Sequence, residues 1–265
     1  SEVKMSKISQ LARSDPHSML TQADVHWIEL DSVDSTNDYL ARAYQQGRVS
    51  GLNAVLAHMQ TAGRGRAGRP WRAQPGASLC LSLGLPMMGQ QIPFLPLCVG
   101  VAVAQVLEQW KVPVQLKWPN DLLVDGRKLA GILSVAGPIK QMMTDIDSYA
   151  APDFVVVGLG LNVGWAPDGA VCLQEFATAN VSRDAVLAAL LVELNHLLEL
   201  SPTHLHERYR AKLSTLQRAV RIELPSGEFV EGRAMDVEVD GRLVVLDSCG
   251  ITQRLDVGDI IHLRS

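Results

Sequence analysis

The stretch GRGRAGRPW, residues 63 to 71, lies between two apolar runs, NAVLAHMQ and ASLCLSLGL, that resemble β-strands. The dinucleotide and P-loop glycine motifs instead lead from a strand into a helix. The dinucleotide motif also needs an acidic residue about 20 positions later, whereas here no Asp or Glu occurs before Glu108. A P-loop needs Lys and then Ser or Thr where this chain has Arg69 and Pro70. The stretch therefore excludes both motifs and predicts a loop that joins two strands.

The charges around this loop favour an anionic ligand. Between Tyr39 and Leu107 there is no acidic residue and no lysine. The basic residues of that span are all arginines, namely Arg42, Arg48, Arg64, Arg66, Arg69 and Arg72. Glycines let a backbone approach a ligand closely, and guanidinium groups match phosphate and carboxylate geometry. The formal net charge of the whole chain is −4. The basic character is therefore local, and a dedicated nucleic-acid-binding protein is not expected.

The remaining patterns predict an α+β fold, with a catalytic domain built on a mixed β-sheet covered by helices. Helical spacing and end signals predict helices over residues 34 to 47, 93 to 107 and 182 to 200, and a further helix ending near residue 213. The Asp125-Gly126 pair between two apolar runs predicts a hairpin, and FVVVGLGLNV predicts a buried strand. Residues 165 to 180 lack a period and are expected to form a loop.

From about residue 218 the sequence changes to short β-rich runs separated by Ser-Gly, Asp-Gly and Cys-Gly turns. This pattern predicts a small SH3-like β-barrel. We therefore expect three parts: a short N-terminal extension over residues 1 to 26, a larger catalytic domain over 27 to 217, and the barrel over 218 to 265. The extension is too short for a three-helix DNA-binding module and is expected to form at most one short helix.

The cysteines and apolar runs indicate the compartment. Cys80, Cys98, Cys172 and Cys249 include no C-x-x-C pair, so neither a zinc site nor a disulfide framework is predicted. Each is expected to be a buried small apolar residue. The longest apolar run, residues 93 to 107, is too short to span a membrane, and the first ten residues lack the apolar core of a signal peptide. A cytoplasmic protein with no membrane partner is expected.

Five separated motifs together point to one family. They are DSTN at 34 to 37, QTAGRGRAGRPW at 60 to 71, KWPNDLL at 117 to 123, GRKLAGIL at 126 to 133 and GLGLNV at 158 to 163. With the predicted C-terminal barrel, they closely resemble the biotin protein ligases, in the form that lacks an N-terminal DNA-binding domain. The resemblance covers the chain from about residue 27.

The resemblance implies an activity and its partners. Members of this family make biotinoyl-AMP from biotin and ATP with Mg²⁺, and then transfer biotin to one lysine of the biotin carboxyl carrier domain of a biotin-dependent carboxylase. Biotin is then a substrate, and no tightly bound prosthetic group is implied. No nucleic-acid partner is expected, and a homodimer formed through the catalytic sheet is possible.

The resemblance also implies roles for single residues. It gives catalytic roles to Arg66, Lys128 and Asp121, and makes Asp121 the candidate metal ligand. The residues implied to bind biotin are Ser35, Thr36, Asn37, Gln60, Gly63, Arg64, Gly65, Lys128, Gly131, Gly158 and Gly160. The residues implied to bind ATP or the adenylate are Arg64, Arg66, Arg69, Trp71, Asn120, Lys128 and Asn162, with Trp165 and Phe176 as candidates to cover the adenine.

Position 67 departs from the form of the motif that has a further arginine there, because it is Ala67. One positive charge fewer puts tight retention of the adenylate in doubt. Two alternatives stay open: a lipoate or octanoate protein ligase, whose catalytic fold is similar, and a non-catalytic nucleic-acid-binding module. The glycine loop, GRKLAGIL and the barrel disfavour the first. The second requires aromatic residues among the basic ones, and between Tyr44 and Phe94 only Trp71 qualifies.

Overall fold

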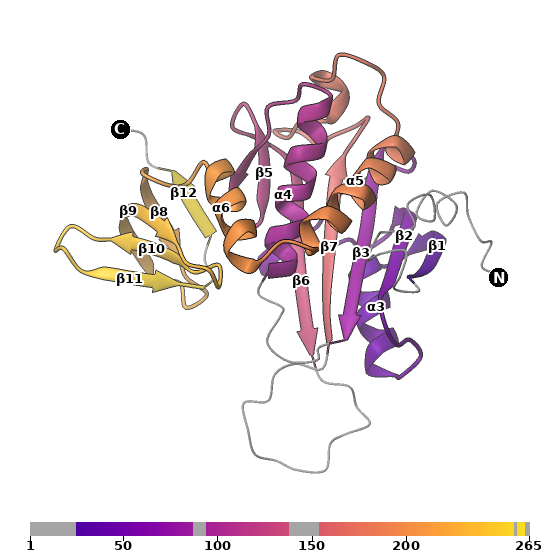
Figure 1. Cartoon of the computed structure of the whole chain (residues 1–265), viewed down its shortest axis with the longest axis horizontal. Helices are drawn as coiled ribbons and strands as arrows, with labels where there is room; N and C mark the ends of the chain where they lie inside the picture. The colour runs from indigo at the N-terminus through magenta and orange to yellow at the C-terminus, as the bar shows by residue number, and fades with distance from the viewer. Residues whose placement is uncertain (1–24, 87–93, 138–153, 257–258, 263–265) are drawn as a thin grey trace, which may run out of the picture.

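The computed structural model describes residues 25–86, 94–137, 154–256 and 259–262 (Figure 1). Its largest element is a seven-stranded sheet in the order β1-β2-β3-β7-β6-β5-β4. The strands are β1 (His26–Val33), β2 (Asn53–Gln60), β3 (Ser78–Pro86), β4 (Gln115–Lys117), β5 (Asp121–Val124), β6 (Arg127–Gly137) and β7 (Phe154–Asn162). Only the β1–β2 pair is parallel. The predicted mixed sheet is thus confirmed, as are the strand–loop–strand arrangement around the glycine stretch and the hairpin at Asp125-Gly126.

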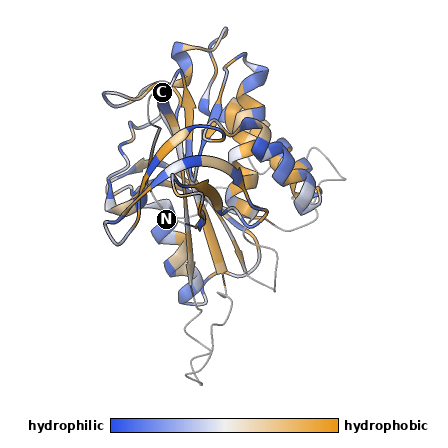
Figure 2. Cartoon of the chain, turned by 90° about the vertical axis from the view of Figure 1, so that its left-hand side faces the viewer, coloured by the Kyte–Doolittle hydropathy of each residue, from blue (hydrophilic) through white to orange (hydrophobic). Residues whose placement is uncertain are grey.

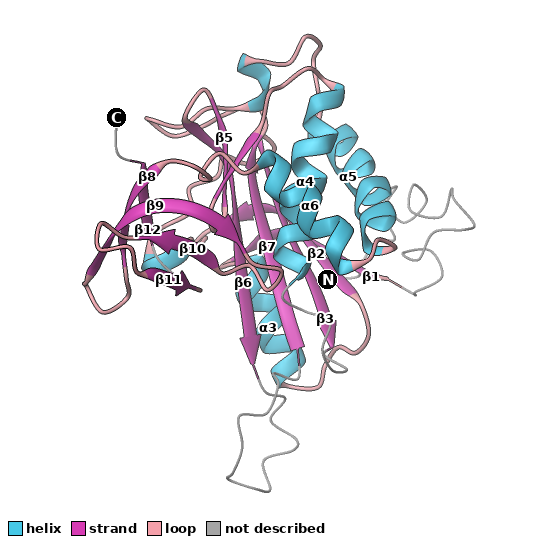
Figure 3. Ribbon diagram, turned by 60° about the vertical axis from the view of Figure 1, so that its left-hand side comes forward, coloured by secondary structure: helices cyan, strands magenta, loops and turns pink. Residues whose placement is uncertain are grey.

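Helices cover both faces of this sheet. On one face lie α4 (Phe94–Gln109), α5 (Arg183–Leu198) and α6 (Pro202–Lys212), grouped together in Figure 3. They bury one large apolar cluster that includes Leu56, Leu81 and Leu159. On the other face lies α3 (Thr36–Gln45), packed on a smaller cluster that includes Val55, Phe154 and Val156. Because side chains alternate along a strand, neighbouring residues such as Val55 and Leu56 serve opposite faces, and the strands of Figure 2 are mostly hydrophobic.

Strand β1 was not predicted from the sequence. Its sequence, HWIELDSV, places charged residues among apolar ones, and the strand lies half-buried at the sheet edge. Its parallel partner β2 is remote in sequence, and helix α3 makes the crossover between them. Two 3₁₀ turns were also not predicted, η1 (Arg66–Gly68) in the glycine stretch and η3 (Leu173–Glu175) in the expected loop. Single turns of this kind leave no periodic signal.

The C-terminal part forms a separate five-stranded antiparallel sheet in the order β11-β10-β9-β8-β12. Its strands are β8 (Ala219–Glu223), β9 (Phe229–Val237), β10 (Leu243–Leu246), β11 (Thr252–Leu255) and β12 (Asp259–His262). The start of β8 agrees with the predicted change at residue 218. Within the described residues the pairings give an open order, with β11 and β12 at its ends.

Hydrogen bonds join the two sheets. The indole Nε1 of the buried Trp118 donates to the carbonyl of Gly241 at 2.9 Å, and its backbone N–H donates to Thr215 Oγ1 at 3.1 Å. His206 on α6 hydrogen-bonds the carbonyl of Val237 at 2.7 Å. Since Trp118 begins the turn that carries Asn120 and leads into Asp121 at the start of β5, these hydrogen bonds hold the C-terminal sheet next to candidate site residues.

The cysteines, the possibility of a membrane span and the N-terminal extension were also subjects of prediction. Cys80, Cys98 and Cys172 are buried as predicted, but Cys249 is exposed, because it lies in the turn between β10 and β11 rather than in a strand. Burial raises the pKa of the Cys80 thiol to about 11. Of the helices in the described part of the chain, none is long and apolar enough to cross a membrane. The N-terminal extension, with its expected short helix, lies outside the described residues apart from its last two positions.

Candidate active site

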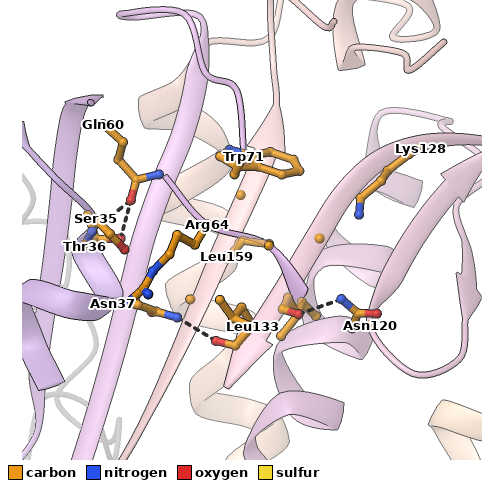
Figure 4. Close-up of a pocket in the computed structure, with 15 residues that line it drawn as sticks. Ser35, Thr36, Asn37, Gln60, Arg64, Trp71, Asn120, Lys128, Leu133 and Leu159 are labelled. Carbon is orange, nitrogen blue, oxygen red and sulfur yellow. Dashed lines mark hydrogen bonds between the residues drawn. The ribbon is translucent and has the colours of Figure 1, made fainter. Parts of the chain in front are cut away.

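A pocket opens on the face of the large sheet that also carries α3 (Figure 4). Its empty space of about 430 Å³ includes volume open to solvent, and such a volume suits a small-molecule ligand. It lies between the start of α3, the glycine stretch and strands β5 to β7. The lining residues are Ser35, Thr36, Asn37, Gln60, Arg64, Gly65, Trp71, Asn120, Lys128, Gly131, Ile132, Leu133, Gly158, Leu159 and Gly160.

This lining gathers most of the predicted site residues from all five motifs. Seven of them fall outside it: Gly63, Arg66, Arg69, Asp121 and Asn162, together with Trp165 and Phe176, the two candidates to cover the adenine. Conversely, Ile132, Leu133 and Leu159 line the pocket and were not predicted. They stand in strand runs that are almost continuously apolar or glycine, so nothing in the sequence separates a pocket wall from the core.

One end of the pocket is polar and almost fully enclosed. Ser35 caps α3, its hydroxyl accepting from the Asp38 N–H at 3.4 Å. Gln60 Oε1 accepts the N–H of Thr36 at 2.8 Å and lies 3.1 Å from the Thr36 hydroxyl. Asn37 Nδ2 donates to the carbonyl of Leu133 at 2.8 Å. These side chains are thus fixed before any ligand binds.

A serine beneath this end was missed by the sequence analysis. Ser82, on β3, has no exposed surface, and its hydroxyl lies 2.7 Å from both Thr36 Oγ1 and Asn37 Oδ1. In SLCLSLGL the leucines face the large cluster, so the alternation places Ser82 on the pocket face. The only available signal was a polar residue inside a strand that is otherwise buried.

Three glycines make room for the side chains around the pocket. A Cβ at Gly158 would lie 2.4 Å from Asn37 Oδ1, and a Cβ at Gly160 would lie 2.3 Å from Trp71 Cε2. At Gly131 it would lie 3.2 Å from Lys128 Nζ. The absence of a side chain at Gly158 and Gly160 is therefore required to seat the Asn37 amide and the Trp71 indole, whereas at Gly131 the flexible Lys128 side chain would have to shift only slightly.

The glycine stretch is folded into a compact loop. Trp71 N–H donates to the Gly63 carbonyl at 2.8 Å, and Gly65 N–H donates to the Arg69 carbonyl at 2.7 Å. A Cβ at Gly63 would lie 2.7 Å from the Trp71 carbonyl, so Gly63 closes the base of the loop instead of lining the pocket. At the tip Ala67 has a φ of 51°, a left-handed conformation. Arg64 projects from the loop to form an ion pair with Asp38 on α3.

The opposite end of the pocket is cationic. Lys128 lies at the start of β6, and its Nζ is 2.6 Å from Asp121 Oδ1 on β5. The Lys128 Nζ also lies 5.8 Å from the centre of the Trp71 ring. Arg66 Nη1 donates to Asn120 Oδ1 at 3.4 Å, which brings this predicted cation next to the pocket. Arg69 Nε donates to the Arg66 carbonyl at 3.3 Å. The Lys128 side chain is 39% exposed, so a ligand can reach it and replace Asp121 as its partner.

Asn162 lies just beyond this end, at the close of β7. It is buried, and its Nδ2 donates to the Val171 carbonyl at 3.1 Å, while its Oδ1 has no hydrogen-bond partner among the described residues. The Val171 N–H donates to the Lys128 carbonyl at 2.9 Å. The segment after β7 therefore ties Asn162 and Lys128 together. Phe176 in this segment contacts Arg127, whose guanidinium carbon lies 5.8 Å from its ring centre.

Within the described ranges, no group of three or more His, Cys, Asp and Glu side chains could hold a metal ion. Asp121 alone supplies a carboxylate next to Lys128. Mg²⁺ is commonly bound through one or two carboxylates together with substrate phosphates. The residues present therefore fit a Mg²⁺ ion carried by a nucleotide, and they do not form a site that is complete without one.

Comparisons with known proteins agree with this geometry. A family model described as the Biotin/lipoate A/B protein ligase family matches residues 29–142. The chain is 38% identical over 256 residues to a Mycobacterium tuberculosis protein named biotin–[acetyl-CoA-carboxylase] ligase, and the match covers 90% of each chain. It is 31% identical over 246 residues to the bifunctional ligase/repressor BirA of Bacillus subtilis, covering 85% of this chain and 71% of that protein.

Solved structures give the same result. The biotin protein ligase from Aquifex aeolicus in complex with biotin and ATP has a TM-score of 0.72 and 27% identity, covering 91% of this chain and 99% of that one. The chain thus belongs to the biotin/lipoate A/B protein ligase family, among the biotin–[acetyl-CoA-carboxylase] ligases.

Proposed function

We propose that this chain activates biotin with ATP to form biotinoyl-AMP and then transfers biotin to a lysine of a biotin carboxyl carrier domain. The observation that carries this proposal is that one pocket holds Thr36, Asn37 and Gln60 at one end and Lys128 at the other. A cyclic urea needs both donors and acceptors, which hydroxyl and amide side chains provide. A carboxylate at the far end of the same ligand would meet the cation.

In the first step, a biotin carboxylate oxygen attacks the α-phosphorus of ATP, and the bond to the bridging oxygen breaks to release pyrophosphate. Negative charge grows on the phosphate oxygens, where placed cations lower the barrier. Lys128 would leave Asp121 to contact the carboxylate and the α-phosphate. Arg66 would contact the phosphates from the glycine loop, with Arg69 beside it, and Arg64 would turn from Asp38 toward the ligand.

The nucleotide would lie near Trp71, Asn120 and Asn162. Asn162 Oδ1, which has no hydrogen-bond partner among the described residues, would accept a hydrogen bond from the amino group of adenine. Mg²⁺ arriving with ATP would take Asp121 and phosphate oxygens as ligands and neutralise charge on the leaving pyrophosphate. Trp165 and Phe176 are proposed to cover the adenine when the nucleotide is bound.

In the second step, the neutral amine of the acceptor lysine attacks the acyl carbon, the acyl–oxygen bond breaks and AMP leaves. The amine must lose a proton, and Asp121 is placed to accept it once Lys128 has moved to the acyl phosphate. Asp121→Asn should therefore lower transfer from preformed biotinoyl-AMP by about 100-fold. Pyrophosphate exchange should also fall, because Asp121 is the proposed Mg²⁺ ligand, whereas transfer from preformed biotinoyl-AMP starts after pyrophosphate has left and reports the base alone. Unchanged transfer in this variant would exclude Asp121 as the base.

Other features of the proposal concern the whole chain. We propose that the C-terminal sheet curves into a small SH3-like barrel, that the domain boundary lies near residue 217, and that the enzyme acts in the cytoplasm, with a homodimer through the large sheet possible. A lipoate or octanoate ligase is the alternative, because the family model includes lipoate ligases. The relatives named above favour biotin.

The direct test uses a purified carrier domain as acceptor, with ATP and Mg²⁺ and with biotin, lipoate or octanoate as the acid. Mass spectrometry should show one added biotinyl group on one lysine, and none when that lysine is replaced by arginine. Attachment of lipoate or octanoate instead would leave the family assignment intact and would contradict biotin as the substrate.

A further inference from the structure

The polar end of the pocket rests on one buried hydroxyl. Ser82 lies in the middle of β3, fully buried, and contacts Thr36 Oγ1 and Asn37 Oδ1 at 2.7 Å each. Both partners line the pocket, and Ser82 does not. It therefore acts on a ligand only through the two residues above it.

Two oxygens of this group are fixed as hydrogen-bond acceptors. Gln60 Oε1 faces the Thr36 N–H at 2.8 Å, and Asn37 Nδ2 faces the Leu133 carbonyl at 2.8 Å, which turns Asn37 Oδ1 toward Ser82. Exchanging the oxygen and nitrogen of either amide would set like groups against each other. Because backbone groups hold both amides, only the hydroxyl hydrogens of Thr36 and Ser82 are free to choose partners.

These hydroxyls have too few hydrogens for their contacts. Three oxygen–oxygen contacts run in a row, Gln60–Thr36 at 3.1 Å, Thr36–Ser82 at 2.7 Å and Ser82–Asn37 at 2.7 Å. Each hydroxyl has one hydrogen, so two hydrogens serve three contacts and one contact always lacks a hydrogen. An enclosed cluster with such a deficit has lone pairs to offer, and the matching ligand is one that brings N–H donors.

We propose that Ser82 is a positioning residue that makes this end of the pocket select a ligand head with ring N–H groups. The Ser82 hydroxyl contacts Thr36 Oγ1 and Asn37 Oδ1 on the side away from the pocket. Both oxygens therefore offer lone pairs to the ligand. This inference rests on the proposed function, since biotin has a cyclic urea with two N–H groups. Without the Ser82 hydroxyl, the remaining contact of the Thr36 hydroxyl is Gln60 Oε1 at 3.1 Å, which already accepts the Thr36 N–H. The Thr36 hydroxyl can then turn to donate to a ligand oxygen, and the selection weakens.

The test compares biotin with its cyclic carbonate analogue, in which oxygens replace both ring N–H groups. The quantity measured is the dissociation constant of the carbonate analogue divided by that of biotin, both determined by calorimetry on the whole chain. Ser82→Ala should weaken biotin binding about tenfold and lower the ratio by a similar factor, as expected for one buried hydrogen bond. The KM for ATP should not change, because the cationic end of the pocket is untouched.

Two further variants make the test decisive. Ser82→Cys keeps the side-chain size but has a weak donor, so its ratio should also fall, and it replaces Ser82→Ala if that variant does not fold. Ser78→Ala removes another buried hydroxyl of β3, one that accepts from the Gln74 N–H at 3.2 Å outside the pocket, and should leave the ratio unchanged.

The outcomes separate this inference from the proposed function. An unchanged ratio in folded Ser82→Ala and Ser82→Cys would overturn the role of Ser82, because a purely structural defect weakens both ligands equally. Biotin binding without biotinoyl-AMP formation would overturn the proposed function alone. Failure of the unaltered chain to bind biotin would overturn both.

Discussion

At the residue scale, the site depends on small groups placed within a few ångströms of each other. Lys128 and Asp121 form a half-exposed ion pair, and such pairs contribute little stability, so the lysine can exchange its partner for a ligand at low cost. Gly158 and Gly160 have the opposite character, because the space above each is already filled by Asn37 or Trp71. A change at either glycine must therefore displace a residue of the site.

Gly160→Ala is predicted to impair ligand binding with limited loss of stability. The added Cβ would lie 2.3 Å from Trp71 Cε2, so the indole must move away from the pocket and from Lys128. Strain of this size costs about 1–3 kcal/mol, and the KM for ATP should rise about tenfold or more. Steady-state kinetics measures it.

Gly164→Ala is the matched control. The added Cβ would meet Ala77 at 3.6 Å, an ordinary contact, and the kinetic constants should stay near those of the unaltered chain. Equal kinetics in the two variants would show that Trp71 does not need its present position.

At the element scale, the start of α3 and the glycine loop form the site together. Ser35, Thr36 and Asn37 open the helix, and Arg64 reaches from the loop to Asp38 on its first turn. The DSTN motif predicted both a helix cap and ligand contacts, and the structure confirms the cap. The ion pair with Asp38 and the contacts of Ser82 could not be predicted, because they join residues that are remote in sequence and carry no local pattern.

The entry into α3 should also respond to pH. The side-chain hydrogen bonds from Arg42 lower the pKa of Asp34 below its ordinary value of 3.8, despite an opposing effect of burial. A lowered pKa in the folded state gives stability that is present above the unfolded pKa and is lost as the pH falls through the folded one. Asp34→Asn should therefore lower Tm slightly at neutral pH, and the difference should vanish as the pH falls through the lowered pKa of Asp34.

Thermal unfolding followed by circular dichroism from neutral to acidic pH checks this. Asp31→Asn, at an exposed position of β1, removes the same charge and should show little difference at any pH. A Tm difference for Asp34→Asn that persists in acid would show that the ion pair is not its source.

At the scale of the whole molecule, the two sheets are joined through Trp118. The patterns of hydrophobicity and turns predicted the mixed sheet, the helices and the change at residue 218, because each depends on local periodicity or on turn residues. They did not predict β1, whose partner is distant in sequence, nor the role of Trp118. Burial of Trp118 between the sheets is a property of packing, which the KWPND motif alone does not encode.

Trp118→Phe should destabilise the chain by about 2 kcal/mol, since it removes the hydrogen bond to Gly241, leaves that carbonyl unpaired and opens a small void. Chemical denaturation measures the free energy of unfolding. Trp27→Phe is the control, because its indole N–H has no partner among the described residues, and it should cost less. Equal losses would mean that the hydrogen bond between the sheets adds nothing.

In the proposed function, one pocket binds biotin at its polar end and activates the carboxylate at its cationic end. Biotin-dependent exchange of labelled pyrophosphate into ATP with Mg²⁺ tests it most directly, with lipoate and octanoate in parallel and with Lys128→Ala and Arg66→Ala. We predict that the unaltered chain catalyses exchange with biotin and not with lipoate or octanoate. The exchange rate with biotin should be about 100-fold or more lower in each variant. If the folded protein catalyses exchange with none of the acids, biotin activation in this pocket is contradicted. If the variants catalyse exchange as well as the unaltered chain, the roles of Lys128 and Arg66 are contradicted.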